Sequence, residues 1–414
     1  MKVAIIGGSA QSTPALIDYL ASEARASALQ LTLIGRSRER LAAVGRASKV
    51  LSNDGPIRIE CAELRSPGFD RAIENADVVI LQLRVGGYAG RDYDETFPLK
   101  YGVCGDEGLG PGGLSAAWRS WPEIEPLIDR VNAAAPGALL LVLSSPLGIM
   151  VRAATRICSQ VRVLGICELP WTTLQDICRS VGESPDHALF EYFGVNHLGW
   201  FHYVSVDGRD LVKEYTCSQR GKSTFPSDKL IEECSGVPAK YLKLHYHREK
   251  VIANQRRLNK SRGKTLDELS RAAFPIYSSG TREEIKTVLG SRATPWYSDA
   301  VGPLLISLMG RNVRIPFFLS APNEGSYARL REEDILEVPY VIEGGRLKRL
   351  KQSRPIPEHL AELTGAFVES ERLAATAILH RDVSLLEQSL RVHPWTRELK
   401  NTQKMVRDIT QLSQ

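Results

Sequence analysis

Short apolar runs and helical patterns alternate through the first part of the chain. Six of these runs are rich in Val, Ile and Leu and show no apolar–polar alternation, which is typical of strands covered on both faces of a sheet. They occupy residues 3–6, 31–34, 57–61, 76–84, 137–144 and 161–167. Helical segments separate them, such as one that begins at Thr13-Pro14 and the charged segment 38–51. The pattern predicts a doubly wound α/β fold around a parallel sheet.

The rest of the chain carries a different pattern, in which strand pairs and long helices are mixed. Strands are predicted at 190–195, 201–206, 336–342 and 346–350, with a hairpin turn at Glu343-Gly344-Gly345, and helices at 241–259 and 358–380. No repeat, low-complexity tract or long linker separates the two parts. We therefore expect a Rossmann-like domain over 1–165 that is interlocked with an α+β domain over 166–414.

Composition and charge argue against several classes of protein. The 53 basic and 48 acidic residues nearly balance, and no basic run is dense enough to predict nucleic-acid binding. No apolar run approaches the ~18 residues of a membrane span, and the chain begins with a strand pattern rather than a signal peptide. The seven cysteines show no tight spacing. We expect a cytoplasmic protein without a membrane span, whose cysteines are mostly reduced.

Ligands of doubly wound sheets bind beyond the carboxyl ends of the strands. The first run is followed by Gly7-Gly8-Ser9-Ala10, whose small side chains suit a pyrophosphate at a helix N-terminus, although the spacing also suits a plain tight turn. An acidic residue often follows the second strand and binds the ribose 2′-OH, but here Arg36 stands there. Arg36 is either solvated or in contact with a 2′-phosphate, so NAD is the first expectation and NADP stays open.

A series of short blocks along essentially the whole chain resembles one enzyme family. The blocks are 81–87 (LQLRVGG), Arg91, Asp94-Glu95, 98–102 (PLKYG), Gly105-Asp106-Glu107, Gly112-Gly113, 165–167 (GIC), 194–198 (GVNHL), 238–242 (PAKYL), Tyr297-Ser298 and His393-Pro394. In this order they are similar to glycoside hydrolase family four, and most similar to its 6-phospho-β-glucosidase branch. The resemblance implies a lactate/malate dehydrogenase-like fold, NAD, a divalent metal such as Mn²⁺, and a homodimer or homotetramer.

Members of that family hydrolyse glycosides by a route that differs from two-carboxylate hydrolysis. NAD takes a hydride from C3 of the sugar, a base removes the acidified C2 proton, and the glycosidic oxygen leaves by elimination. Water then adds and the hydride returns. The resemblance thus implies a glycosidase that hydrolyses O-glycosidic bonds, with 6-phospho-β-glucosides as the first expected substrates.

The resemblance assigns chemical roles to four residues. Cys167 and His197 would be the metal ligands, because a thiolate and an imidazole suit a divalent transition metal; taken alone, a core thiol and a hydrogen-bonded histidine are the simpler interpretations. Tyr241 would be the C2 base, which requires a cation to lower its pKa from about 10, and Glu168 would protonate the leaving oxygen. The alternatives are Tyr246 as the base and His202, His245 and His247 as ligands.

Substrate contacts are expected from Arg84, Ser145, Asn196 and Arg292, which fall on family positions. Glu107 and Arg119 do so too. For the charged residues among them a structural ion pair is an equally good interpretation.

Three departures from the family pattern affect the expected substrate. Ala10 replaces a serine that helps to hold the sugar 6-phosphate in some members, Ser145-Pro146 replaces Asn-Pro, and Asp106 and Gly108 replace Gln and Thr. They leave open a glycoside, α or β, that is unphosphorylated or otherwise modified at C6. The alternatives of another class are an NAD-dependent dehydrogenase, which would release NADH, and a non-catalytic sugar or nucleotide sensor.

Overall fold

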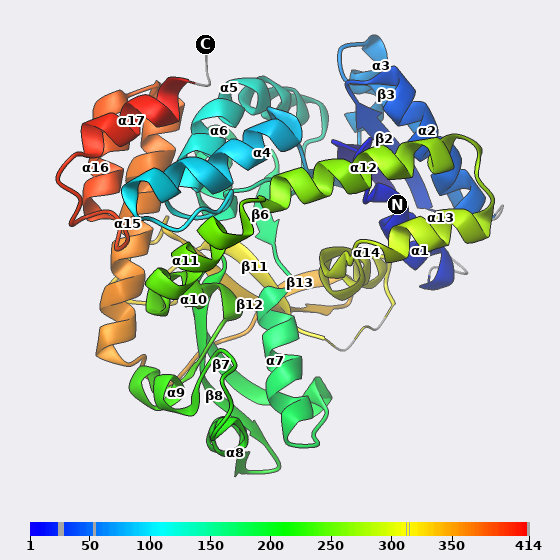
Figure 1. Ribbon diagram of the computed structural model, residues 1–414. Coiled ribbons are helices and arrows are strands. Elements are labelled where there is room, and N and C mark those ends of the chain that lie inside the picture. The colour runs from blue at the N-terminus through cyan, green and yellow to red at the C-terminus, as the bar shows by residue number, and fades with distance from the viewer. Residues whose placement is uncertain (24–28, 53–54, 312, 314, 412–414) are drawn as a thin grey trace.

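The computed structural model describes residues 1–23, 29–52, 55–311, 313 and 315–411. A nine-stranded sheet forms its centre, with the strand order β13-β12-β11-β6-β5-β4-β1-β2-β3 (Figure 1). The parallel strands are β1 (Lys2–Ile6), β2 (Leu29–Gly35), β3 (Ile57–Glu63), β4 (Val78–Leu81), β5 (Leu139–Val142) and β6 (Arg162–Ile166). Their order, 3-2-1-4-5-6, is that of a doubly wound dinucleotide-binding sheet, so the predicted fold class is confirmed.

The apolar runs became central strands because both of their faces are covered. All four residues of β4 and all four of β5 are buried, as are Val3, Ala4, Ile5 and Ile6 of β1. The sheet reverses its direction of growth between β1 and β4. The carboxyl ends of these two strands therefore face a crevice, the usual ligand position of such sheets.

The chain after β6 adds three antiparallel strands to the same sheet. These are β11 (Phe317–Pro322), β12 (Ile335–Glu343) and β13 (Arg346–Arg349), and β11 pairs with β6 through Leu319↔Ile166 and Ser320↔Gly165. A second, smaller sheet holds β7 (Leu189–Val195), β8 (Leu198–Val206), β9 (Arg209–Asp210) and β10 (Val237–Pro238). One sheet thus runs across the expected domain boundary at 165/166, and that boundary stays a prediction.

Helices surround both sheets (Figure 1). In the first half they are α1 (Thr13–Glu23), α2 (Arg38–Ser52), α3 (Pro67–Ile73), α4 (Gly87–Thr96), α5 (Gly110–Ala134) and α6 (Leu147–Ile157). They continue with α7 (Leu169–Ser180), α8 (Leu211–Gln219), α9 (Asp228–Cys234), α10 (Lys243–Tyr246), α11 (Arg248–Leu258), α12 (Arg262–Ser279), α13 (Arg282–Gly290) and α14 (Gly302–Leu308). The last are α15 (Glu358–His380), α16 (Val383–Val392) and α17 (Thr402–Gln411). Short 3₁₀ turns lie at Phe97–Tyr101, Pro185–His187 and Lys240–Leu242, and a π turn at Tyr297–Val301.

One predicted helix is wrong. The segment 241–259 is divided into the end of a 3₁₀ turn, α10 and α11, with a break at His247, whose φ and ψ are −122° and 36°. The thiol of Cys104 lies 3.6 Å from the carbonyl oxygen of Leu244 and 3.7 Å from that of Arg248. One of these carbonyl groups precedes His247 and the other follows it, and both face the thiol. The helix is interrupted between them. The predicted strands and hairpin of the second half, and the helix 358–380, are confirmed.

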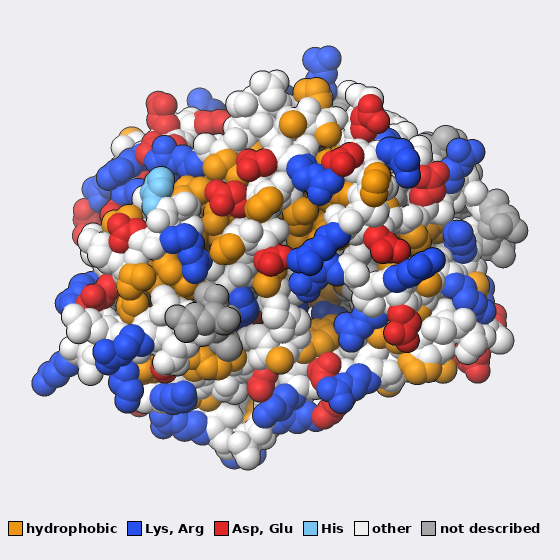
Figure 2. Space-filling model, turned by 90° about the horizontal axis from the view of Figure 1, so that it is seen from above, with side chains coloured by type: hydrophobic (Ala, Val, Ile, Leu, Met, Phe, Trp, Pro, Cys, Tyr) orange, Lys and Arg blue, Asp and Glu red, His pale blue; other side chains and the backbone are white. Residues whose placement is uncertain are grey.

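No described helix is long and apolar enough to cross a membrane. On the face shown in Figure 2, basic and acidic side chains are interspersed. That face therefore has no continuous basic stripe of the kind that follows a nucleic-acid backbone.

A buried ion triad joins the two halves of the chain. The carboxylate of Asp334, which is fully buried, accepts from Arg152 on α6 at 3.0 Å and from Arg372 on α15 at 3.0 and 3.1 Å. Burial alone would raise the pKa of Asp334, but the hydrogen bonds and charges of the two arginines bring it below its ordinary value. The triad therefore stabilises the fold when Asp334 is ionised.

We expect Asp334→Asn to lower the free energy of unfolding by about 3–5 kcal/mol at pH 7, because it removes the buried carboxylate that Arg152 and Arg372 share and leaves them only the more exposed carboxylates of Glu333 and Glu369. A depressed folded-state pKa contributes stability above the unfolded value of about 3.9, and this contribution is lost as the pH falls through the folded pKa. The difference between the variant and the wild type should thus shrink below about pH 4.

Urea denaturation across that pH range measures the effect. Glu358→Gln serves as a control, since Glu358 forms an exposed ion pair with Arg329 and its loss should change stability little. A difference for Asp334→Asn that does not depend on pH would contradict the assignment.

Candidate active site

A cleft of about 760 Å³ opens at the carboxyl ends of β1, β2, β4, β5 and β6. Nearly all of the expected site residues line it: Gly7, Ser9, Ala10, Arg36, Arg84, Ser145, Cys167, Glu168, Asn196, His197, Tyr241 and Arg292. Gly8 is the exception, because it is buried behind the turn. A Cβ atom added to it would lie 2.8 Å from the Cα atom of Leu33. The structure thus brings together residues that are up to 285 positions apart in the sequence, from Gly7 to Arg292 (292 − 7).

The glycine turn after β1 is held against the end of β4. Gly7 has a φ of +93°, and a Cβ atom there would lie 2.7 Å from the carbonyl oxygen of Gln82, so only glycine fits. Gln82 donates to the Gly7 carbonyl oxygen at 3.3 Å and to Thr13 Oγ1 at 3.1 Å, and it accepts from Tyr297 Oη at 2.7 Å. The turn therefore presents bare backbone beside the start of α1, which is the form of a phosphate cradle.

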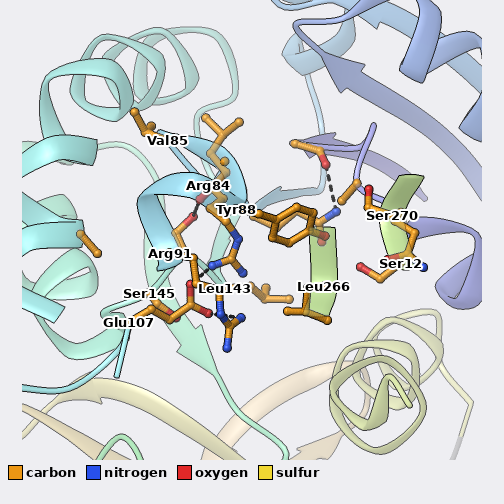
Figure 3. A pocket seen from close by; sticks show the side chains of 18 of the residues that line it. Ser12, Arg84, Val85, Tyr88, Arg91, Glu107, Leu143, Ser145, Leu266 and Ser270 are labelled. Carbon is orange, nitrogen blue, oxygen red and sulfur yellow. Dashed lines mark hydrogen bonds and ion pairs between the residues drawn. The ribbon is translucent and has the colours of Figure 1, made fainter. Parts of the chain in front are cut away.

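Cationic side chains gather beyond β4 and on α4. Arg84 forms an ion pair with Glu107, whose other carboxylate oxygen lies 2.5 Å from an Nη atom of Arg91 (Figure 3). Burial lowers the pKa of Arg84, and the guanidinium groups of Arg91 and Arg292 lower it further. An arginine stays protonated even so. The guanidinium groups of Arg84, Arg91 and Arg292 thus concentrate positive charge here, where an anion would be stabilised.

Two further contacts hold this cationic wall in place. Arg119 pairs with the buried Asp94 at 3.0 and 2.5 Å and donates to the carbonyl oxygen of Val85 at 3.1 Å. A Cβ atom on Gly86 would lie 2.8 Å from Arg119 Nε. Arg119 is therefore a structural residue under the turn that carries Arg84, and Glu107 is likewise engaged in ion pairs.

Arg292 reaches the same wall from the loop after α13. Its Nη1 atom lies 3.4 Å from Gln11 Oε1 and 3.4 Å from Tyr88 Oη, and its guanidinium group lies over the ring of Trp296. These bonds are long and no described carboxylate pairs with Arg292, so its charge is available to a ligand.

Cys167 and His197 lie at two strand ends on one side of the cleft. Cys167 follows β6 directly, and His197 lies in the turn between β7 and β8 with a φ of +68°. Burial raises the pKa of the Cys167 thiol well above its ordinary value and lowers that of His197 to about 4. The imidazole is thus neutral, and its buried Nδ1 atom has no hydrogen-bond partner. A buried thiol and an unpartnered neutral imidazole fit a divalent transition-metal cation.

The described residues contain no group of three or more His, Cys, Asp or Glu side chains that could hold a metal ion. A metal at this place would therefore have two protein ligands and would draw its remaining ligands from the substrate or water. His202, His245 and His247 do not line the cleft, so they are not ligands of such a site.

Tyr241 and Glu168 flank the Cys167–His197 pair. The ring of Tyr241 stacks on that of His197 with 4.1 Å between centroids. Burial raises the pKa of Tyr241, as do the charges of Asp106 and Cys167, and the Arg91 guanidinium offsets this only in part. The chain's own cations therefore do not bring the pKa of Tyr241 below its ordinary value, in contrast to the expectation that a neighbouring Lys or Arg could do so. Burial also raises the pKa of Glu168.

Tyr246, the alternative base, lies outside the cleft lining, and burial raises the pKa of its hydroxyl group.

Sequence reasoning missed one residue behind the site. Glu337 of β12 is almost fully buried and accepts from Tyr192 Oη at 2.6 Å and from Asn196 Nδ2 at 2.9 Å. Asn196 also interacts with the Cys167 thiol and directly precedes His197 in the chain, so Glu337 holds a side chain that adjoins both candidate ligands. In the sequence, an acidic residue inside the apolar run 335–342 could have indicated this buried role.

We expect Glu337→Leu to destabilise the protein by about 1–3 kcal/mol for each of the two donors left unsatisfied. Glu337→Gln should cost less, because its amide oxygen still accepts from one of them. The measurement is urea denaturation of both variants. A Leu variant as stable as the wild type would show that the two donors find other partners.

Comparison with known proteins gives the family. Residues 2–183 match the model of the family 4 glycosyl hydrolases, and residues 192–396 match that of the family 4 glycosyl hydrolase C-terminal domain. The chain belongs to this family. It is 26% identical to the 6-phospho-beta-glucosidase BglT of Thermotoga maritima over 99% of this chain and 97% of the other. It is 27% identical to 6-phospho-alpha-glucosidase 1 of Lacticaseibacillus paracasei over 85% of this chain and 84% of the other.

A solved structure of the 6-phospho-beta glucosidase from Thermotoga maritima, with manganese, NAD+ and glucose-6-phosphate, has the same fold. Its TM-score is 0.86 at 23% identity, over 100% of this chain and 98% of the other. The predicted family and fold are thereby confirmed.

Proposed function

We propose that this protein is a glycosidase that cleaves glycosides carrying an anionic group at C6, with 6-phosphoglucosides first, through transient oxidation at C3. The observation that carries the proposal is the placement of Cys167 and His197 in the same cleft as the Gly7 turn. A hydrolase that worked by two carboxylates alone would need neither. The two relatives described above act on 6-phosphoglucosides, one beta and one alpha.

The residues present fit both groups that the family's chemistry requires. The Gly7 turn brings bare backbone to the cleft beside the start of α1, where a pyrophosphate would lie, and Cys167 and His197 would hold a metal such as Mn²⁺. When bound, a nicotinamide dinucleotide accepts and returns the C3 hydride and the divalent metal polarises the C3 oxygen.

The chain's own residues move the protons. Tyr241 Oη would accept the C2 proton as a phenolate, a form that a metal cation held by Cys167 and His197 would favour, and the Glu168 carboxyl group would protonate the leaving glycosidic oxygen. Ser145 and Asn196 line the same cleft, where they would contact sugar hydroxyl groups. In this proposal Arg84, Arg91 and Arg292 bind the anion at C6, since arginine suits phosphate and carboxylate oxygens.

We expect Tyr241→Phe to reduce kcat/KM for an aryl glycoside by about 10²–10⁴, the usual contribution of a general base. Tyr246→Phe is the matched control and should retain activity, because Tyr246 lies outside the cleft. Glycoside deuterated at C2 should react more slowly with the wild-type enzyme. Equal rates for the two isotopologues, together with an active Tyr241→Phe variant, would exclude proton removal by Tyr241.

The same assay separates the alternative functions. A dehydrogenase would accumulate reduced nicotinamide and release no aglycone, whereas the proposed glycosidase releases aglycone without net reduction. A sensor would do neither.

The group at C6 is tested with three aryl glycosides of one anomer: the 6-phosphoglucoside, the glucosiduronate and the plain glucoside. We expect kcat/KM for the 6-phosphoglucoside to exceed that for the plain glucoside at least about 100-fold, because a site built around a polar group rejects an analogue that lacks it. Arg292→Gln should shrink this ratio, while Lys286→Gln on α13, which does not line the cleft, should not. Equal rates for all three glycosides would eliminate an anion-specific site, and a preference for the glucosiduronate would assign a carboxylate in place of the phosphate.

The anomer, the cytoplasmic location and the homodimeric or homotetrameric state stay predictions from the sequence.

A further inference from the structure

The end of the cleft beyond β2 carries positive charge. Arg36 and Ser37 follow the last residue of β2, Arg40 lies in the first turn of α2, and all three line the cleft. Both arginines are exposed, and no described carboxylate forms an ion pair with either of them. Arg38, between them, lies outside the cleft lining and is the one that pairs with Glu63, at 3.7 Å. The charge that faces the cleft is therefore not compensated by an ion pair with any carboxylate that the structure describes.

The position of this charge relative to the glycine turn is fixed by close packing. A Cβ atom on Gly35, the residue before Arg36, would lie 2.6 Å from Ser9 Oγ in the turn after β1. The end of β2 therefore touches the turn that would receive a pyrophosphate. In a dinucleotide-binding sheet the ribose next to that turn belongs to the adenosine half, and the residue after the second strand faces its 2′ position.

The type of residue after the second strand decides which group binds at the 2′ position of this ribose. A carboxylate accepts a hydrogen bond from a free 2′-OH and repels a 2′-phosphate, whereas an arginine pairs with the phosphate. The segment Gly35-Arg36-Ser37-Arg38 contains no carboxylate, and Glu39 does not line the cleft. Nothing in this segment therefore selects for a free hydroxyl group.

Helix α12 forms the opposite wall and holds Arg40 in position. The Arg40 guanidinium group lies 5.0 Å from the ring centroid of Phe274. Arg46 donates to the carbonyl oxygens of Tyr277 and Gly280, which ties α2 to the end of α12. Arg271 of α12 also lines the cleft, but Asp267 pairs with it at 2.5 Å. The unpaired cations of this end are thus Arg36 and Arg40.

We propose that this end of the cleft binds the 2′-phosphate of an adenine dinucleotide through Arg36, Ser37 and Arg40, so that the protein binds NADP in preference to NAD. The proposal rests on the proposed function only in that a nicotinamide dinucleotide occupies the cleft.

Equilibrium titration of the protein without glycoside tests it, by calorimetry with NADP⁺, NAD⁺, 2′,5′-ADP and 5′-AMP. We expect Kd for NADP⁺ to be at least roughly tenfold lower than Kd for NAD⁺. We also expect 2′,5′-ADP to bind more tightly than 5′-AMP by a similar factor. Arg36→Ala should remove most of the ratio, Arg40→Ala part of it, and Arg36→Asp should favour NAD⁺. Arg38→Ala is the matched control and should leave the ratio unchanged.

Several outcomes would overturn the proposal. They are a Kd for NAD⁺ equal to or below that for NADP⁺, no binding of either dinucleotide, or an unchanged ratio in the Arg36→Ala/Arg40→Ala double variant. Each variant is compared by its thermal unfolding, so that a misfolded protein is not mistaken for a binding defect. Failure here is distinct from failure of the glycosidase function. If the protein binds NADP⁺ but cleaves no glycoside, only the glycosidase proposal fails. If it cleaves glycosides without favouring NADP⁺, only the cofactor proposal fails.

Discussion

The pairing of β11 with β6 is the contact on which the site depends. Leu319↔Ile166 and Ser320↔Gly165 attach the second half of the chain to the sheet immediately before Cys167. Through β11 the same pairing fixes β12, because Glu337 is opposite Ser320. Glu337 then binds Asn196, the residue next to His197. A slip of one residue in this register would turn Glu337 to the other face of the sheet and leave Asn196 without its acceptor.

Charge in the cleft follows from how completely each cation is paired. Arg119 is satisfied by Asp94 and the Val85 carbonyl group, so it supports the turn and has little left for a ligand. Arg84 and Arg91 share Glu107, and Arg292 has no described carboxylate partner. The site is thus a cluster of arginines whose positive charge is only partly compensated by carboxylates. This arrangement stabilises the folded protein without a ligand and still favours an anion, since fully paired arginines would offer no attraction and fully unpaired ones would repel one another.

The sequence predicts the parallel sheet well because its strands are covered on both faces, and a short continuous apolar run such as 76–84 is typical of such a strand. Arg84 and Cys167 are predicted as site residues by the resemblance to the family, and each stands at the end of such a run, where a parallel sheet places its ligands. Prediction from the sequence fails where a distant partner decides local structure. The break at His247 accompanies a thiol 140 positions away from Leu244, and the importance of Glu337 depends on strand register. Neither is encoded in local periodicity.

The order of the strands also assigns a direction to the cleft. From β2 to β6 the sheet runs β2, β1, β4, β5, β6, which is four strand spacings or roughly 19 Å. Arg36 lies at one end of this row, the Gly7 turn next to it, Arg84 and Ser145 after β4 and β5, and Cys167 at the far end. A dinucleotide whose pyrophosphate lies at the turn has one end directed to β2 and the other toward β5 and β6. Only the second end meets a thiol, an imidazole, a phenol and a carboxyl group. The topology alone therefore separates the part of the cleft that recognises the cofactor from the part that can carry out chemistry.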